Sequence, residues 1–304
     1  MVSSRTLLLT VPATLLLVFG ITLLGPACSG TGEPGGGTSV LASNAIVADW
    51  ARNVAGDNLE VDTLIPQGAD PHTFQLSPAG IRAIAGADLI ILVGAGLESS
   101  FKDTVVENAK GTIVTLSDDL VLAPATGDAE DDEHAHGEFD PHIWMDPDLA
   151  IQSVTHIAGA LSALHPGEAE TFDANAAAYI TQIRTMDESV AAQLAALAPA
   201  ERILVTFHDA YGYFADQYGL TVLGFVVENA DEEPSAARVA TLIRDIRESG
   251  AVAIYREPQF NARVVDQVAA EAGVPVRLLP SDTLSPAYPT YLDLMHAMAD
   301  AISG

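Results

Sequence analysis

The sequence predicts an α/β protein in which two lobes of parallel sheet, each flanked by helices, are joined by a long rigid helix. Short apolar stretches alternate with helical patterns at both ends of the chain, which is the first observation. The second is the continuous apolar run 88–93, which is typical of a strand buried on both faces. The third is residues 147–198, where two helical patterns follow one another without a strand pattern.

The length of 304 residues, 49% of them hydrophobic, favours two domains. We expect an N-terminal lobe at residues 39–166, a linking helix at 167–199 and a C-terminal lobe at 200–304. At about 1.5 Å per residue the linking helix would span roughly 45 Å, enough to join the lobes. Residues 1–38 would form a signal peptide, a lipid-attachment cysteine and a flexible tether.

In the N-terminal lobe the helix start at Ser77-Pro78 is the clearest boundary signal. Serine caps a first helical turn and proline fits its first position. The patterns predict strands at 39–42, 59–65, 88–93 and 112–116, with helices at 46–54, from 77 onward and at 97–109.

The remainder of the chain begins with two consecutive helices and then returns to alternation, so the C-terminal lobe should repeat the architecture of the first. The helices are expected at 148–164, 168–197, 209–218, 234–249, 261–272 and 289–302, and the strands at 202–207, 220–227, 251–255 and 274–279.

The formal net charge is −28, from 41 acidic and 13 basic residues. Such an acidic surface repels polyanions, so we expect no nucleic-acid partner. The charge would also raise the local concentration of cations, although solubility alone can explain it.

Cys28 is the only cysteine, which excludes an intrachain disulfide. It follows Arg5 and an apolar run at 7–24, the pattern of an export signal. The segment Ala27-Cys28-Ser29-Gly30 is similar to the end of a lipoprotein signal, although Gly25 stands where that pattern usually has leucine. We expect Cys28 to be lipidated and the folded part to lie outside the cytoplasm, membrane-anchored or periplasmic. An uncleaved membrane anchor is the alternative.

An acidic loop at 127–140 interrupts the alternation and contains His134 and His136. It has no apolar periodicity, so we interpret it as a mobile loop. The two histidines are either solvated side chains or an auxiliary metal-capture site.

Two Asp-Pro-His tripeptides, ending at His72 and His142, form the most informative motif. Proline restricts the backbone around each histidine and disfavours a helix there. His208 follows a third predicted strand. Because ligands of parallel sheets bind beyond the carboxyl ends of the strands, we expect a metal site at the lobe interface, with His72 and His142 on one wall and His208 on the other.

A carboxylate is the expected fourth donor beside three imidazoles, which suit zinc, copper and nickel. Asp282 occupies a strand-end loop of the C-terminal lobe and is the first candidate. Glu228, Glu257 or a water molecule are the alternatives. We expect Trp144 and Phe207 to form walls of the site and not to bind metal.

The segments 70–74, 140–147, 208–211 and 233–235 (Asp-Pro-His-Thr-Phe, Asp-Pro-His-Ile-Trp-Met-Asp-Pro, His-Asp-Ala-Tyr and Glu-Pro-Ser) together resemble the ordered motifs of a known family. The chain resembles the metal-binding solute receptors of zinc and manganese ABC importers (ZnuA-like, cluster A-I) over almost all of its mature length. The resemblance implies two α/β lobes, a helical spine and a metal held between the lobes. It also implies a non-enzymatic receptor, acting as a monomer, that delivers zinc to an ABC transporter permease with its ATPase.

In this resemblance the ligands map to His72, His142, His208 and Asp282. The manganese branch has glutamate at the position of His208, so three imidazoles favour Zn²⁺ over the alternative Mn²⁺. A zinc-dependent hydrolase is a further alternative, in which water occupies an open position. The sequence contains no His-Glu-x-x-His motif. A surface adhesin of the same fold is the last alternative.

Overall fold

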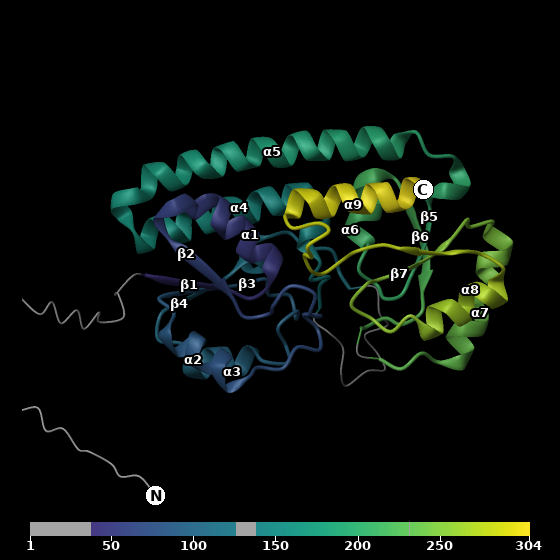
Figure 1. The fold of residues 1–304 in the computed structure, drawn as a ribbon, viewed down its shortest axis with the longest axis horizontal. Helices are drawn as coiled ribbons and strands as arrows, with labels where there is room; N and C mark the ends of the chain where they lie inside the picture. Colours follow the sequence, from purple (N-terminus) through teal and green to yellow (C-terminus); the bar gives the residue numbers. More distant parts are fainter. Residues whose placement is uncertain (1–37, 126–137, 231) are drawn as a thin grey trace, which may run out of the picture. The chain divides into compact units, whose positions relative to one another are not determined.

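A four-stranded parallel sheet with the order β2-β1-β3-β4 forms the centre of the N-terminal half, the elements before α5 (Figure 1). Alternate residues of β3 pack into two different apolar clusters, one on each face. This burial on both faces confirms what the apolar run 88–93 predicts. The strands are β1 (Ser39–Ala42), β2 (Glu60–Thr63), β3 (Leu89–Leu92) and β4 (Thr112–Thr115).

Helices cover both faces of this sheet. One face packs on α1 (Ala45–Ala55) and the other on α2 (Pro78–Gly86) and α3 (Lys102–Asn108), which lie on opposite sides in Figure 1. The Ser77 hydroxyl accepts from the backbone N–H of Gly80 and Pro78 opens the helix, so the boundary expected from the sequence is confirmed.

The computed structural model describes residues 38–125, 138–230 and 232–304. The expectations for Cys28, His134 and His136 therefore concern residues outside the described part of the chain. Among the described residues, no helix combines the length and the apolar character needed to cross a membrane.

The helix α5 (Ala169–Ala195) follows α4 (Pro147–Leu164) and connects the two halves. Its 27 residues span about 40 Å at 1.5 Å per residue. One side of α5 packs on α1 and α4 and also on α9 (Tyr291–Ser303), the last helix of the chain (Figure 1). Helices from both ends of the chain are thereby held against one long helix.

The C-terminal half, the elements after α5, contains two parallel strand pairs. β5 (Ile203–Thr206) pairs with β6 (Thr221–Phe225), and β7 (Ile254–Arg256) pairs with β8 (Val276–Leu278). The helices are α6 (Gly212–Tyr218), α7 (Ala236–Ser249) and α8 (Arg263–Ala272). The predicted α/β class with parallel sheets flanked by helices is confirmed. The strand–helix alternation predicted for the C-terminal lobe occurs, but its strands form two short parallel pairs where the N-terminal half has one four-stranded sheet, and the register of the first pair shifts between Leu204 and Val205.

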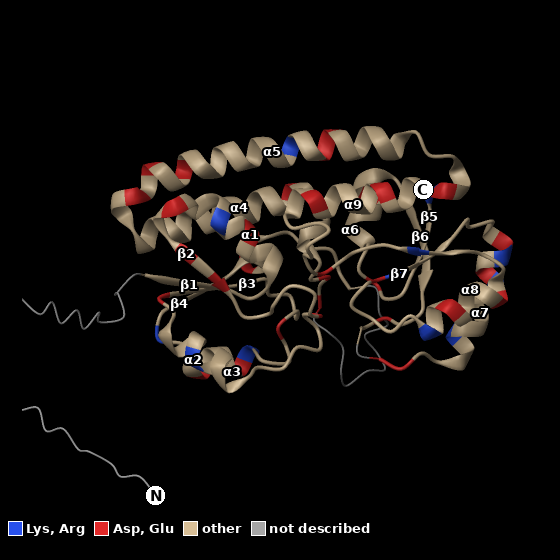
Figure 2. Cartoon of the chain, viewed as in Figure 1, with Lys and Arg blue, Asp and Glu red and all other residues tan. Residues whose placement is uncertain are grey.

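Acidic and basic residues are spread over both halves of the chain (Figure 2). Acidic residues lie on helices and loops of both halves, and the Arg residues of α7 and α8 are interspersed with acids. Negative charge is therefore not confined to one half of the molecule.

Candidate metal centre

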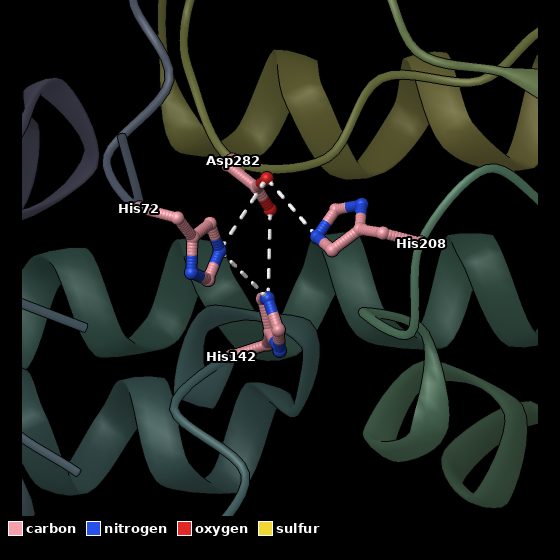
Figure 3. A group of neighbouring side chains, drawn as sticks. All are labelled: His72, His142, His208 and Asp282. Atoms are coloured by element: carbon pink, nitrogen blue, oxygen red, sulfur yellow. Dashed lines mark hydrogen bonds and ion pairs between the residues drawn. The ribbon is translucent and has the colours of Figure 1, made fainter. Parts of the chain in front are cut away.

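Three histidines and one aspartate converge in the interior of the molecule (Figure 3). One possible ligand atom from each of His72, His142, His208 and Asp282 lies within 4.8 Å of the others. All four side chains are buried. They come from the loops that follow β2, β4, β5 and β8, as expected for ligands beyond the carboxyl ends of parallel strands.

Two of the distances between these atoms match the edge of a tetrahedral zinc site. The Nε2 atoms of His72 and His142 are 3.3 Å apart, and Nε2 of His208 lies 3.4 Å from Oδ2 of Asp282. Zinc with donors at about 2.0–2.1 Å has donor–donor edges of about 3.3 Å. The distances from Asp282 to His72 and His142 are slightly longer, at 3.9 Å each. The donor set is therefore close to the size required by one small divalent cation.

Two of the donor atoms are buried without a hydrogen-bond partner among the described residues, His208 Nε2 and Asp282 Oδ1. Buried polar atoms are normally paired, so such orphans require an explanation. A cation between the four side chains would satisfy both atoms.

The first two histidine loops are shaped by their own aspartates. The backbone N–H of His72 donates to Asp70 Oδ1 at 3.1 Å, and that of His142 donates to Asp140 Oδ1 at 2.9 Å. Aspartate forms such turns readily two residues ahead of the donor, and the intervening proline restricts the backbone. The repeated tripeptide is thus a repeated local structure that presents an imidazole.

Asp140 also orients the ring of His142. Its Oδ1 lies 2.6 Å from His142 Nδ1, which places Nε2 toward the donor group. Burial would lower the pKa of His142, but the carboxylates of Asp140 and Asp282 outweigh it and raise that pKa above the ordinary value.

His208 receives the corresponding support from Glu257. Its Nδ1 lies 2.8 Å from Oε2 and 3.0 Å from Oε1 of this carboxylate, which follows β7. Burial would lower the pKa of His208, but Glu257 and Asp282 raise that pKa to about 10. For Asp282, burial raises the pKa to about 6, although His208 and His142 pull in the opposite direction.

The loop that carries Asp282, residues 279–283 (the Asp282 loop), is bonded to all three histidine loops. The Tyr211 hydroxyl donates to its first carbonyl at 3.1 Å, and Trp144 Nε1 donates to another carbonyl in it at 3.1 Å. Gly68 N donates to Thr283 Oγ1 at 2.8 Å. These bonds fix the carboxylate relative to the imidazoles.

The alternative donors expected from the sequence lie elsewhere. Glu257 lies on the Nδ1 side of His208, and Glu228 forms an ion pair with Arg238. Neither belongs to the group of close donor atoms.

The aromatic walls differ from the expectation in one position. The Trp144 ring lies 5.4 Å from that of His142, as expected for a wall. Phe260, which the sequence analysis missed, lies 5.3 Å from the ring of His208, while Phe207 packs behind it at 4.9 Å. The sequence feature that could have indicated Phe260 is the segment 257–260, in which an acidic residue and a proline follow a predicted strand, and the two Asp-Pro-His tripeptides also begin with an acidic residue and a proline.

Solved structures of periplasmic metal-binding proteins share this fold. A metal-free mutant of such a protein from Candidatus Liberibacter asiaticus has a TM-score of 0.77 and 29% identity, covering 88% of this chain and 98% of that one. A ZnuA deletion mutant with zinc bound has a TM-score of 0.77 and 26% identity, covering 88% and 97%. The fold is thus that of the periplasmic metal-binding proteins.

The family described as ZnuA, the zinc-uptake complex component A, periplasmic, matches residues 40–304, and the chain belongs to this family. It is 32% identical over 282 residues to the zinc-binding lipoprotein AdcA of Streptococcus pneumoniae, covering 90% of this chain and 56% of AdcA. It is also 28% identical over 264 residues to the manganese-binding lipoprotein MntA of Halalkalibacterium halodurans, covering 86% and 85%. The chain therefore spans little more than half the length of AdcA.

Proposed function

We propose that the protein captures one zinc ion with His72, His142, His208 and Asp282 and delivers it to the permease and ATPase of an ABC importer. The observation that carries this proposal is the buried convergence of three Nε2 atoms and one carboxylate. Two atoms of this group, His208 Nε2 and Asp282 Oδ1, have no hydrogen-bond partner in the part of the chain that the structure describes. Three imidazoles favour zinc over harder cations. The zinc-binding relative AdcA and the ZnuA family support the same assignment.

The donor set favours a receptor over an enzyme. Catalytic zinc sites have three protein ligands and leave a position for water or substrate. Here Asp282 supplies a fourth protein donor from a buried position. A hydrolytic role would require this carboxylate to leave the ion, so we propose that the protein has no enzymatic activity.

Manganese is the second candidate ion. The relative MntA is named as manganese-binding, and solved structures of the Liberibacter protein include a manganese-bound form. The donor set opposes manganese, because that ion prefers more oxygen ligands than the single carboxylate present here.

We further propose the arrangement of the chain around this site. Lobes at residues 39–166 and 200–304 would face each other across the linking helix 167–199. Cys28 would carry the lipid that anchors a monomeric protein outside the cytoplasm, since the family is periplasmic and AdcA is a lipoprotein.

Native mass spectrometry tests the identity of the ion. Purified protein is offered equimolar zinc and manganese, and the mass of the complex is combined with elemental analysis. We expect one zinc per chain in the wild type and in His156→Ala, a control on α4 outside the donor group. One manganese per chain would select the alternative, and no retained ion would overturn the proposal.

Transport requires a separate experiment. Cells lacking this chain should lose zinc uptake at limiting concentration and recover it with the wild-type protein but not with His142→Ala. Uptake that is unchanged on deletion would contradict the role in import, even if the purified protein binds zinc.

A further inference from the structure

We propose that Glu257 is a positioning residue that holds His208 and Asp282 as one unit and supplies the second buried negative charge that offsets the bound ion. The inference rests on the proposed function and extends it to a residue that does not touch the metal. Glu257 would control the affinity for zinc by holding the ring of His208.

The first support is the contact between Glu257 and His208. Both carboxylate oxygens lie within hydrogen-bond distance of His208 Nδ1, at 2.8 and 3.0 Å. A carboxylate only accepts hydrogen bonds, so Nδ1 must carry the proton. Nε2 is then the atom available to an ion, and it is the atom that lies toward Asp282. Outer partners of this kind fix ring orientation and raise the basicity of a ligand histidine.

The second support connects the same carboxylate to the Asp282 loop. Ser281 Oγ donates to Glu257 Oε2 at 2.6 Å. Gln259 Nε2 donates to Ser281 Oγ at 2.9 Å and to Asp282 Oδ2 at 3.2 Å. Glu257 thus accepts hydrogen bonds from His208 and from Ser281, the neighbour of Asp282. His208 and Asp282 therefore cannot move apart without breaking one of these hydrogen bonds.

The third support is burial. The side chains of Glu257 and Asp282 are 1% and 0% exposed, whereas that of Asp140 is 16% exposed. A divalent ion enclosed in this interior needs two negative charges nearby, because isolated buried charges are costly. Asp282 supplies one by direct contact, and Glu257 supplies the other through the imidazole of His208.

Two substitutions separate the charge from the hydrogen bond. Glu257→Gln keeps an acceptor oxygen for Nδ1 and removes the charge, while Glu257→Leu removes both. The matched control is Glu228→Gln, which makes the same chemical change in the loop that follows β6, in a residue paired with Arg238. Circular dichroism and thermal melting establish that each variant is folded.

Zinc affinity is measured by competition with a chelator, and the His208 ring is observed by ¹⁵N NMR in the zinc-loaded protein. We expect about a 10-fold loss of affinity in Glu257→Gln and up to about a 100-fold loss in Glu257→Leu, the range found for outer partners of metal ligands. The slowly exchanging Nδ1–H signal of His208 should persist in Glu257→Gln and disappear in Glu257→Leu. Glu228→Gln should match the wild type.

If Glu257→Leu does not fold, Glu257→Gln alone decides the matter. Wild-type affinity in folded Glu257→Gln, or an equal loss in Glu228→Gln, would overturn the inference while leaving zinc capture in place. Failure of the wild-type protein itself to bind zinc would overturn the proposed function and this inference together.

Discussion

The two halves of the site support their histidines by different means. In the N-terminal half the partner of His142 is Asp140, two residues away and partly exposed. In the C-terminal half the partner of His208 is Glu257, 49 residues away and buried. A local support forms wherever the tripeptide is present, whereas a long-range support exists only once β5 and β7 are assembled. We therefore expect a buried, distant partner to matter more for affinity than a partly exposed, local one.

The largest effect is expected from removing one of the four proposed metal donors itself, in this case a donor of the N-terminal half. His142→Ala should weaken zinc binding by more than about 100-fold, beyond the range for loss of an outer partner. The fold should remain, because the sheet and helix cores do not depend on this imidazole. Chelator competition with circular dichroism measures both properties, and global unfolding would show that His142 is a structural residue.

Lowering the pH should weaken zinc binding by protonating ligands from both halves of the site. The carboxylates raise the pKa values of His142 and His208 above that of an ordinary histidine, to about 10 for His208. Below its pKa each ring carries a proton that zinc must displace, so affinity rises with pH and is lost as pH falls. Near pH 6 Asp282 also takes up a proton. Affinity should therefore fall more than about tenfold per pH unit below neutrality.

Titrations at several pH values, corrected for protonation of the chelator, measure this slope. A slope of one proton or less throughout would leave at most one histidine in the site, and the three-histidine arrangement would have to be abandoned.

A smaller effect is expected from the exposed local partner. Asp140→Asn keeps an acceptor for His142 and removes a charge that is less buried than that of Glu257 and is partly screened by solvent. We expect a loss of affinity of a few fold, below the about 10-fold expected for Glu257→Gln. Asp118→Asn, at an exposed acid in a turn after β4, serves as the control. A larger loss in Asp140→Asn than in Glu257→Gln would reverse the comparison.

The smallest effect is expected from the acidic loop. The four proposed donors come from other loops and can fill the coordination of one zinc ion, so the double variant His134→Ala/His136→Ala should retain tight binding. Isothermal titration should show the loss of weak additional binding at most. Loss of the tight site would identify one of these histidines as a ligand.

The elements that depend on local chemistry could be predicted from the sequence. The apolar run 88–93 and the capped helix start at Ser77 both occur as expected. Each is determined by a few neighbouring residues. The convergence of four distant loops was expected from the topology of parallel sheets and from the family motifs, and Figure 3 shows it.

Other features depend on contacts that no local pattern reveals. The expected helix 97–109 begins only at Lys102, because residues 95–101 form consecutive turns, which start at Gly94 and Gly96 with positive φ angles of 88° and 92°. The Glu98 carboxylate accepts from the backbone N–H of Gly94 at 2.9 Å and so stabilises those turns. The support of His208 by Glu257 depends on the packing of β5 beside β7, two strands distant in the sequence, and is absent from any short window of sequence.

The Asp282 loop also bears on how long an ion would stay bound. Tyr211, Trp144 and Gly68 connect it to the loops of His208, His142 and His72. Withdrawal of this one segment would remove the carboxylate and loosen the support of every imidazole together. An ion would then leave in a single opening event, and its residence time would follow the rate of that opening instead of four successive ligand losses.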